Sequence, residues 1–320
     1  MKNHFWREAT VADSAGIVEM YAAEKRHNPR LQIPDLASIE HTLKRVISTP
    51  QAVGTIVVNE SNDVIGVAFV MLFPVENETT GQCFGHVHIG YRAQGIGTAL
   101  FKWMEQMAQR QNTELAADQP LHLRISCRDF MTDRIALFES QGFAPVRHAI
   151  EMQRSLDQPI QAIELPAELI VKQWSESQDD QLRLAFNLAF KDHWGLREFE
   201  TDDWRKRFIE TPHFRPDLTY LAYSDEQLIA FCLVEHHAER NKQSGQNQVW
   251  LEAIGVLPDW RGRGIASGLV TYAMQNYQTE GFSHAGLDVD AENGTNAIAL
   301  YQKLGFAEVQ HEIIYGKCVL

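Results

Sequence analysis

The sequence is poor in cysteine and has no paired cysteines. Four cysteines are scattered over 320 residues, and none forms the C-x-x-C motif of zinc or dithiol redox sites. Such a spread is typical of free thiols in a reducing compartment. No stretch approaches the ~18 apolar residues of a membrane span, and the first residues lack the apolar run of a signal peptide. We therefore expect a cytoplasmic protein without a membrane partner.

Basic residues are also fewer than acidic residues. Lysine and arginine together number 29 against 42 aspartates and glutamates, which gives a net charge of -13. Repulsion from phosphates makes such a chain a poor nucleic-acid binder. An acidic protein attracts a cationic small molecule such as an amine more readily, although an acid excess also serves solubility alone. The histidines are scattered, and their spacing indicates no metal site.

What the sequence does contain is an internal repeat. Repetition of several landmarks in one order indicates a duplicated domain, and the chain length fits about two domains. Three landmarks occur twice, at nearly constant spacing: R-A-Q-G-I-G at 92–97 and R-G-R-G-I-A at 261–266, A-L-F-E-S-Q-G-F at 136–143 and A-L-Y-Q-K-L-G-F at 299–306, V-I-G at 64–66 and L-I-A at 228–230. We expect one domain at 1–156 and another at 168–320, joined by a linker at 157–167 that contains two prolines.

Each copy has the pattern of an α+β domain. A short strand, at 5–8 or 169–173, precedes a helix whose N-cap is Thr10 or Ser175, and a second helix and a hairpin follow. A strand then leads into the glycine-rich segment and a long helix, after which come another strand, a short helix and a closing strand pair. We predict two tandem domains, each with a mixed, mostly antiparallel central sheet and helices on both faces.

The order of strand, arginine, glycine-rich turn and helix favours phosphate binding. The first N–H groups of a helix lack intrahelical partners and face an anion, and glycines let the phosphate approach. A Walker A loop would need Lys-Ser/Thr after its last glycine, which neither copy has. A dinucleotide-binding loop would need glycine or alanine where Ser267 stands. The segments 92–97 and 261–266 instead both match the pattern Q/R-x-x-G-x-G/A.

In these motifs the chain resembles the GNAT superfamily of acetyltransferases, whose acetyl-CoA loop has that pattern. The segment V-L-P-D-W at 256–260 and the motif L-Y/F-x-x-x-G-F near the end of each copy add to the resemblance, which covers essentially the whole chain twice. The tandem layout is most similar to mycothiol synthase and its tandem relatives. The resemblance implies acetyl-CoA as the cofactor. It also implies transfer of acetyl to the primary amine of a small molecule by direct attack in a ternary complex.

The resemblance further implies a set of cofactor-binding residues. In the second copy these are Ile254, Val256, Arg261, Gly262, Arg263, Gly264, Ile265, Ala266, Ser267 and Asn293, and in the first copy Arg92, Gln94, Gly95, Ile96, Gly97 and Thr98. The asparagine departs from the family pattern, because Gly294 occupies its usual place, with Asn293 and Asn296 on either side. The first copy either binds a second CoA or only completes the fold.

The catalytic residues are expected in the second copy. An amine with a pKa near ~10 must lose a proton before it attacks, and a departing thiolate gains from a proton donor. The resemblance implies that Glu252, on the strand before the loop, is the base and that Tyr301, on the late helix, is the acid. The matching positions of the first copy hold Cys83 and Phe138. A phenyl ring carries no exchangeable proton, and an unactivated thiol is a poor base.

Other interpretations of the sequence remain open. His86 and His88 alternate along the strand of the first copy and are an alternative base. A non-catalytic sensor of acyl-CoA would bind the cofactor without turnover, and an enzyme acting on a protein amine would need an open groove. The acceptor pocket is expected in the segment from Phe190–Leu196 through Phe214–Asp217, whose aromatic and acidic residues favour a partly apolar cation. We expect a monomer or a homodimer.

Overall fold

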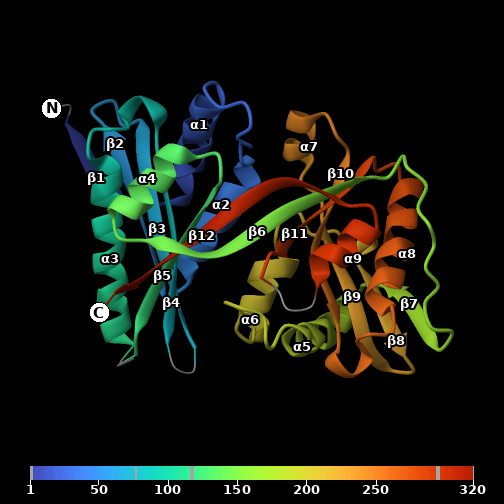
Figure 1. Ribbon diagram of the computed structural model, residues 1–320. Coiled ribbons are helices and arrows are strands. Elements are labelled where there is room, and N and C mark those ends of the chain that lie inside the picture. Colours follow the sequence, from blue (N-terminus) through green and yellow to red (C-terminus); the bar gives the residue numbers. More distant parts are fainter. Residues whose placement is uncertain (1–2, 76–77, 116–118, 293–295, 320) are drawn as a thin grey trace. The chain divides into compact units, whose positions relative to one another are not determined.

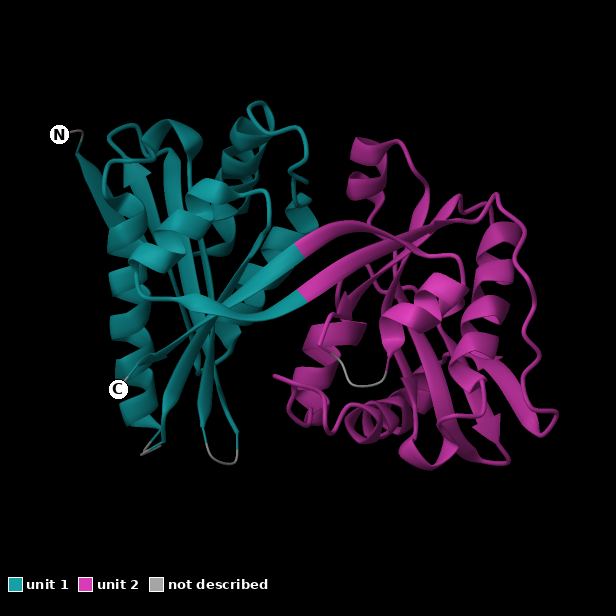
Figure 2. Ribbon diagram, viewed as in Figure 1, with its two compact units in different colours: residues 1–148, 312–320 teal, residues 149–311 magenta. Residues whose placement is uncertain are grey.

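The computed structural model of the chain describes residues 3–75, 78–115, 119–292 and 296–319. The chain divides into two compact units (Figure 2). Unit 1 comprises residues 1–148 and 312–320, and unit 2 comprises residues 149–311. Within the described ranges, no helix is long and apolar enough to cross a membrane.

Unit 1 follows the order of elements predicted for the first copy (Figure 1). Thr10 precedes the first helix in a capping box with Asp13, whose carboxylate accepts from the Thr10 N–H at 2.8 Å. The elements are β1 (His4–Glu8), α1 (Ser14–Lys25), α2 (Leu36–Ser48), β2 (Ala52–Asn59), β3 (Val64–Pro74), β4 (Thr79–Val87), α3 (Ile96–Glu114), β5 (Leu121–Arg128) and α4 (Thr132–Ser140).

Helices cover both faces of the unit 1 sheet, as predicted. Ile56 and Val58 of β2 belong to a buried cluster with residues of α1 and α2. Val57, between them, belongs to a separate buried cluster with residues of α3. Because successive strand residues point to opposite faces of a sheet, the α1–α2 pair and α3 lie on opposite sides.

Unit 2 repeats this plan. Ser175 forms a capping box with Gln178 ahead of its first helix. The helix predicted at 202–210 is a short α-helix that continues into a π-helical turn, and a helix that the sequence did not predict follows the hairpin. The elements are β7 (Leu169–Gln173), α5 (Asp179–Ala189), α6 (Thr201–Trp204), η4 (Arg205–Ile209), β8 (Tyr220–Ser224), β9 (Gln227–Glu235), α7 (Ala238–Ser244), β10 (Gln248–Val256), α8 (Ile265–Thr279), β11 (His284–Asp290) and α9 (Ala297–Lys303).

The part of the sheet that lies in each unit is mixed and mostly antiparallel, which confirms the predicted fold class. Two long strands, β6 (Ala144–Ser155) and β12 (Ala307–Val319), complete these two parts. The strand order is β1-β2-β3-β4-β5-β12 in unit 1 and β6-β11-β10-β9-β8-β7 in unit 2. The strands β4 and β5 pair in parallel, as do β10 and β11. The glycine-rich turn of each copy follows the first strand of its parallel pair, β4 or β10.

The two long strands run from one unit into the other, so the bounds of the compact units differ from those of the predicted domains. Residues 149–155 of β6 belong to unit 2, where they pair with β11. Residues 312–319 of β12 belong to unit 1, where they pair with β5. Each copy thus ends on one long strand instead of a strand pair, and the predicted linker at 157–167 lies within unit 2. A hydrophobic pattern predicts a strand but does not indicate which sheet it joins.

Candidate active site

A cavity of about 630 Å³ in unit 2 is lined by residues of β10, the glycine-rich turn and α9. Asn293 lies outside the described residues. The cavity gathers most of the positions predicted for the second copy, namely Glu252, Ile254, Val256, Arg261, Gly262, Gly264, Ile265, Ala266, Ser267 and Tyr301. The expected acid, base and cofactor loop of this copy therefore face one space.

The turn between β10 and α8 has an open backbone. Gly262 and Gly264 have φ values of 76° and 75°, in the left-handed region that glycine adopts without strain. A Cβ atom built on either glycine would have no heavy atom within 4 Å. Arg261 anchors the turn, because its Nε donates to the Val256 carbonyl at 3.2 Å and its Nη2 to the Ala189 carbonyl at 2.7 Å. This open turn ahead of the first N–H groups of α8 fits a pyrophosphate.

The side chain of Arg263 makes different contacts from that of Arg261. Its guanidinium lies over the Trp260 ring, 4.7 Å from the centroid, and donates to the Asp259 carbonyl at 3.1 Å. The Trp260 ring in turn lines the cavity. Arg263 therefore contributes packing against the turn, and its predicted contact with the cofactor stays a prediction.

A β-bulge in β10 sets the position of Glu252. Leu251 pairs with Val234 and Ala253 pairs with Leu233, so Glu252 falls where the register shifts. A bulge re-aims a side chain and disrupts the ladder of backbone hydrogen bonds. In unit 1, β4 pairs with β3 in continuous register. The bulge thus distinguishes the strand with the predicted base from its counterpart.

Arg207, on η4, binds the Glu252 carboxylate, with 2.7 Å between Nη2 and Oε1. Burial raises the pKa of Glu252 against the opposing charge of Arg207, and the nearby Glu235 carboxylate adds to the rise. Burial also acts on Glu235, but the His237 hydrogen bond and the charges of His237 and Arg207 outweigh it and lower the pKa of Glu235. Two neighbouring carboxyl groups with pKa values moved in opposite directions are typical of acid–base sites.

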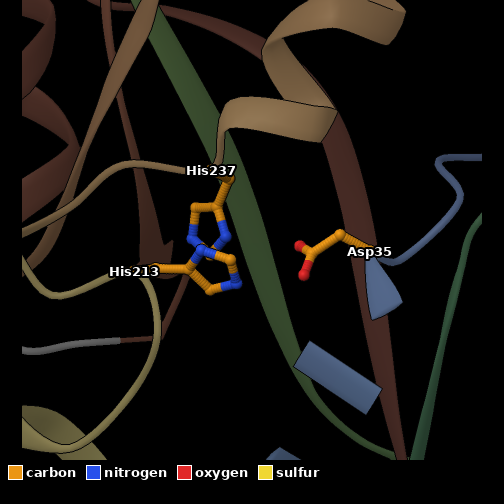
Figure 3. Close-up of side chains that lie close together, drawn as sticks. All are labelled: Asp35, His213 and His237. Atoms are coloured by element: carbon orange, nitrogen blue, oxygen red, sulfur yellow. The ribbon is translucent and has the colours of Figure 1, made fainter. Parts of the chain in front are cut away.

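His237 holds Glu235 in this network, and its ring lies against that of His213 (Figure 3). The imidazoles of His213 and His237 lie with centroids 4.2 Å apart, and His237 Nε2 is 3.0 Å from a Glu235 carboxylate oxygen. The Thr211 hydroxyl donates to the other oxygen at 3.3 Å. Asp35, also labelled in the figure, belongs to unit 1, where its carboxylate caps α2. The contacts within unit 2 fix the Glu235 carboxylate near Arg207.

Tyr301, on α9, lines the same cavity as Glu252. Its ring contacts the Phe306 ring, with centroids 5.8 Å apart. Burial raises the pKa of the Tyr301 phenol, and the neighbouring Cys232 adds to the rise. The hydroxyl therefore stays protonated at neutral pH, as a proton donor must.

Unit 1 has buried side chains at the two matching positions. Cys83 and Phe138 are each 3% exposed. Burial raises the pKa of the Cys83 thiol to about 12, so this group is protonated at neutral pH. Phe138 packs edge-on against the rings of Phe101 and Tyr315. Both side chains thus belong to the core of unit 1.

The alternative bases in unit 1 are poorly suited to accept a proton. His86 is 2% exposed, and burial together with the charges of Arg134 and Arg92 lowers its pKa well below the ordinary value. Burial and the charges of Arg26 and Arg92 also lower the pKa of His88. A histidine with a low pKa stays neutral but has little affinity for a proton.

Part of the cavity wall comes from the segment in which the acceptor pocket is expected, but one contact of this segment was not predicted. Phe190, Asp192, His193 and Leu196 line the cavity. Arg207 lies in the same segment, yet its pairing with Glu252 joins residues 45 positions apart. A contact over that distance leaves no mark on local sequence periodicity.

Comparison with known proteins agrees with this fold. A family model described as the acetyltransferase (GNAT) family matches residues 180–306. A mycothiol acetyltransferase of Frankia casuarinae is 30% identical over 238 residues, which are 72% of this chain and 66% of that protein. The one of Streptomyces coelicolor is 30% identical over 233 residues, 72% of this chain and 69% of that protein.

Comparison with solved structures shows the same fold. The crystal structure of a GCN5-related N-acetyltransferase from Sphaerobacter thermophilus has a TM-score of 0.73 and 24% identity, and the match covers 98% of this chain and 95% of that one. The matched part of the chain spans about two thirds of the length of the curated relatives. With its two repeated units, the chain belongs to the GNAT family of N-acetyltransferases as a tandem member similar to the mycothiol acetyltransferases.

Proposed function

We propose that the chain transfers acetyl from acetyl-CoA to the primary amine of a small molecule, with the chemistry in unit 2. The observation that carries the proposal is that Glu252, Tyr301 and most residues of the segment 261–267 line one cavity. Members of this family use acyl-CoA, and the open turn ahead of α8 fits the pyrophosphate of such a ligand. The acetyl group itself is inferred from the acetyltransferase relatives.

Two side chains would move the protons of the reaction. Glu252 would accept a proton from the acceptor ammonium, through water, so that the free amine attacks the thioester carbonyl carbon. A C–N bond forms, the C–S bond breaks, and Tyr301 would give its proton to the departing thiolate. The second proton that the nitrogen loses on becoming an amide would return to the Tyr301 phenolate, and the proton held by Glu252 would pass to water. The raised pKa of Glu252 supports this role, since a base works best when its pKa approaches the working pH.

The charge of the cavity supports a cationic acceptor. Four acidic side chains line it, those of Asp192, Glu252, Asp288 and Asp290. Arg207, which also lines the cavity, is bound to the Glu252 carboxylate. The curated relatives are named for a small molecule, mycothiol, which favours a small acceptor over a protein. Cytoplasmic location and a monomer or homodimer stay predictions from the sequence.

An amine panel tests the proposal. Acetyl-CoA and a series of small primary amines would be incubated with the protein, and release of free thiol would be followed. We expect turnover with at least one amine, and the Glu252→Gln variant should lose it. Binding of CoA with no turnover on any amine would favour the sensor. Turnover restricted to protein N-termini would favour the protein-modifying enzyme.

Removal of the Arg207 charge should move the pH profile of the reaction. The reaction needs ionised Glu252, so kcat/KM falls as pH drops through the pKa of that group. Arg207 holds this pKa down. In Arg207→Met the acid limb should therefore shift upward by ~1–3 pH units, the range typical for loss of an adjacent opposite charge.

The control is Arg205→Met, on the same helical turn. Arg205 binds Asp179 at 2.7 Å and Glu176 at 2.8 Å, so its loss removes an equal charge without touching Glu252. Its acid limb should stay in place. An acid limb that moves equally in both variants, or stays in place in Arg207→Met, would remove Glu252 from the role of base.

A further inference from the structure

Unit 1 has the same turn as unit 2 at the end of β4. Arg92 Nε donates to the Val87 carbonyl at 3.3 Å, the same contact that Arg261 makes in unit 2. Ala93 and Gly95 have φ values of 57° and 85°, so the backbone takes the left-handed path at both points. The backbone of unit 1 is therefore shaped like that of the proposed CoA site.

The two arginines differ in what binds the rest of their guanidinium groups. In unit 2, Arg261 Nη2 donates to a backbone carbonyl, that of Ala189 at the end of α5. In unit 1, near the end of α1, a glutamate stands at the position that Ala189 occupies in the repeat. The Glu24 carboxylate lies 2.6 Å from Arg92 Nη2, and Asp133 lies 2.7 Å from Nη1. Two carboxylates thus form ion pairs with the guanidinium of Arg92 in the unit 1 turn.

Glu24 is the centre of a larger buried cluster. Its side chain is 4% exposed, and the same carboxylate oxygen is 3.3 Å from Arg134 Nη2 and 3.2 Å from His86 Nε2. Arg134 also donates to His86 Nδ1 at 2.6 Å. Because Nδ1 accepts, the proton of the neutral ring belongs on Nε2, which lies near Glu24 without hydrogen-bond geometry. The net charge of the cluster is zero, because the carboxylates of Glu24 and Asp133 match the guanidinium groups of Arg92 and Arg134. Each charged group lies next to one of opposite sign.

In unit 2, uncharged residues occupy the positions that match Glu24, Asp133 and Arg134. In the repeat that aligns Phe138 with Tyr301, Asp133 and Arg134 correspond to Asn296 and Ala297. Ala297, like Ala189, lines the cavity of unit 2. The side chains of Glu24 and Arg134 consequently extend into the region that alanine leaves open in the other unit.

We infer that the chain holds one CoA, in unit 2, and that a cluster of its own side chains takes the place of a second CoA in unit 1. The inference rests on the proposed CoA site of unit 2. A pyrophosphate at the unit 1 turn would have to displace Glu24 and Asp133 from Arg92 or lie beside their negative charges. Displacement would leave Arg134 without its partner in a buried setting, which is unfavourable.

Further contacts pack the start of α3, next to the unit 1 turn. A Cβ atom on Gly97, in the first turn of α3, would meet Leu137 of α4 at 2.9 Å. Ile96 is 2% exposed, and Gln94 donates to the Gly90 carbonyl at 3.3 Å. The start of α3 is therefore packed against the protein itself. The predicted set in this unit, which also includes Gly95 and Thr98, does not form a cofactor site under this inference.

Calorimetric titration with CoA tests the inference. The unaltered protein should bind one CoA per chain. The triple variant Glu24→Ala, Asp133→Asn, Arg134→Ala gives unit 1 the residues that unit 2 has at the same positions, and it should bind two. In a Gly264→Trp background, where the unit 2 turn is blocked, CoA binding should be absent and should appear when the triple change is added.

The control removes an ion pair elsewhere in unit 1. Arg110 and Glu114 form an exposed pair on α3 at 3.1 Å, and their double alanine variant should still bind one CoA. Two CoA molecules on the unaltered chain would overturn the inference, even if the triple variant failed to fold. A folded triple variant that still binds one CoA would also overturn it. CoA binding without acetylation of any amine would reject the proposed function and leave this inference standing.

Discussion

Acetylation should fall to background in the Gly264→Trp variant and persist in Gly95→Trp. Gly264 precedes α8 with an open space around it, and a Cβ atom at this position would have no heavy atom within 4 Å. An indole there would fill the volume that the pyrophosphate needs. Gly95 has the same place ahead of α3, and its surroundings are equally open. Because the proposed chemistry belongs to unit 2, only the first substitution removes the cofactor from the catalytic cavity.

The two variants are closely matched. Both glycines have left-handed φ values, 75° for Gly264 and 85° for Gly95, so the backbone strain that tryptophan introduces is similar. Circular dichroism and a thermal melt would establish that both proteins are folded before their activities are compared. If folded Gly95→Trp were inactive while Gly264→Trp kept its turnover, the chemistry would belong to unit 1.

The sequence predicts the duplicated plan well because that plan depends on local patterns. The opening strands, the N-caps at Thr10 and Ser175, and the hairpins all occur where periodicity and turn residues indicate them. The glycine-rich turn of unit 2 is likewise a local motif, with φ values that glycine alone adopts readily at Gly262 and Gly264.

Features that depend on distant pairing could not be predicted in this way. Whether β12 joins β5 depends on sheet register, which a hydrophobic run does not encode. The bulge at Glu252 appears only when β10 and β9 are paired. The cluster around Glu24 joins residues of α1, β4, the unit 1 turn and α4, and none of the sequence motifs places these residues together.

Loss of the Tyr301 hydroxyl should strongly slow the chemical step itself. In Tyr301→Phe, kcat should fall by ~10²–10⁴-fold if the phenol is the general acid, while the affinity for CoA stays nearly unchanged. The ring is retained, and unit 1 tolerates phenylalanine at the same place, where Phe138 is packed among aromatic side chains. Single-turnover measurements would separate chemistry from product release, because a slow release step would otherwise conceal the change.

The matched control is Tyr272→Phe, a tyrosine on α8 that is 39% exposed and whose ring contacts Tyr220. It should keep the single-turnover rate of the unaltered protein. The raised pKa keeps the Tyr301 phenol protonated up to high pH, so the alkaline limb of the unaltered enzyme should be no lower than the ordinary range of tyrosine. An unchanged single-turnover rate in Tyr301→Phe would remove Tyr301 from the mechanism, and the thiolate would then have to leave without a proton from this side chain.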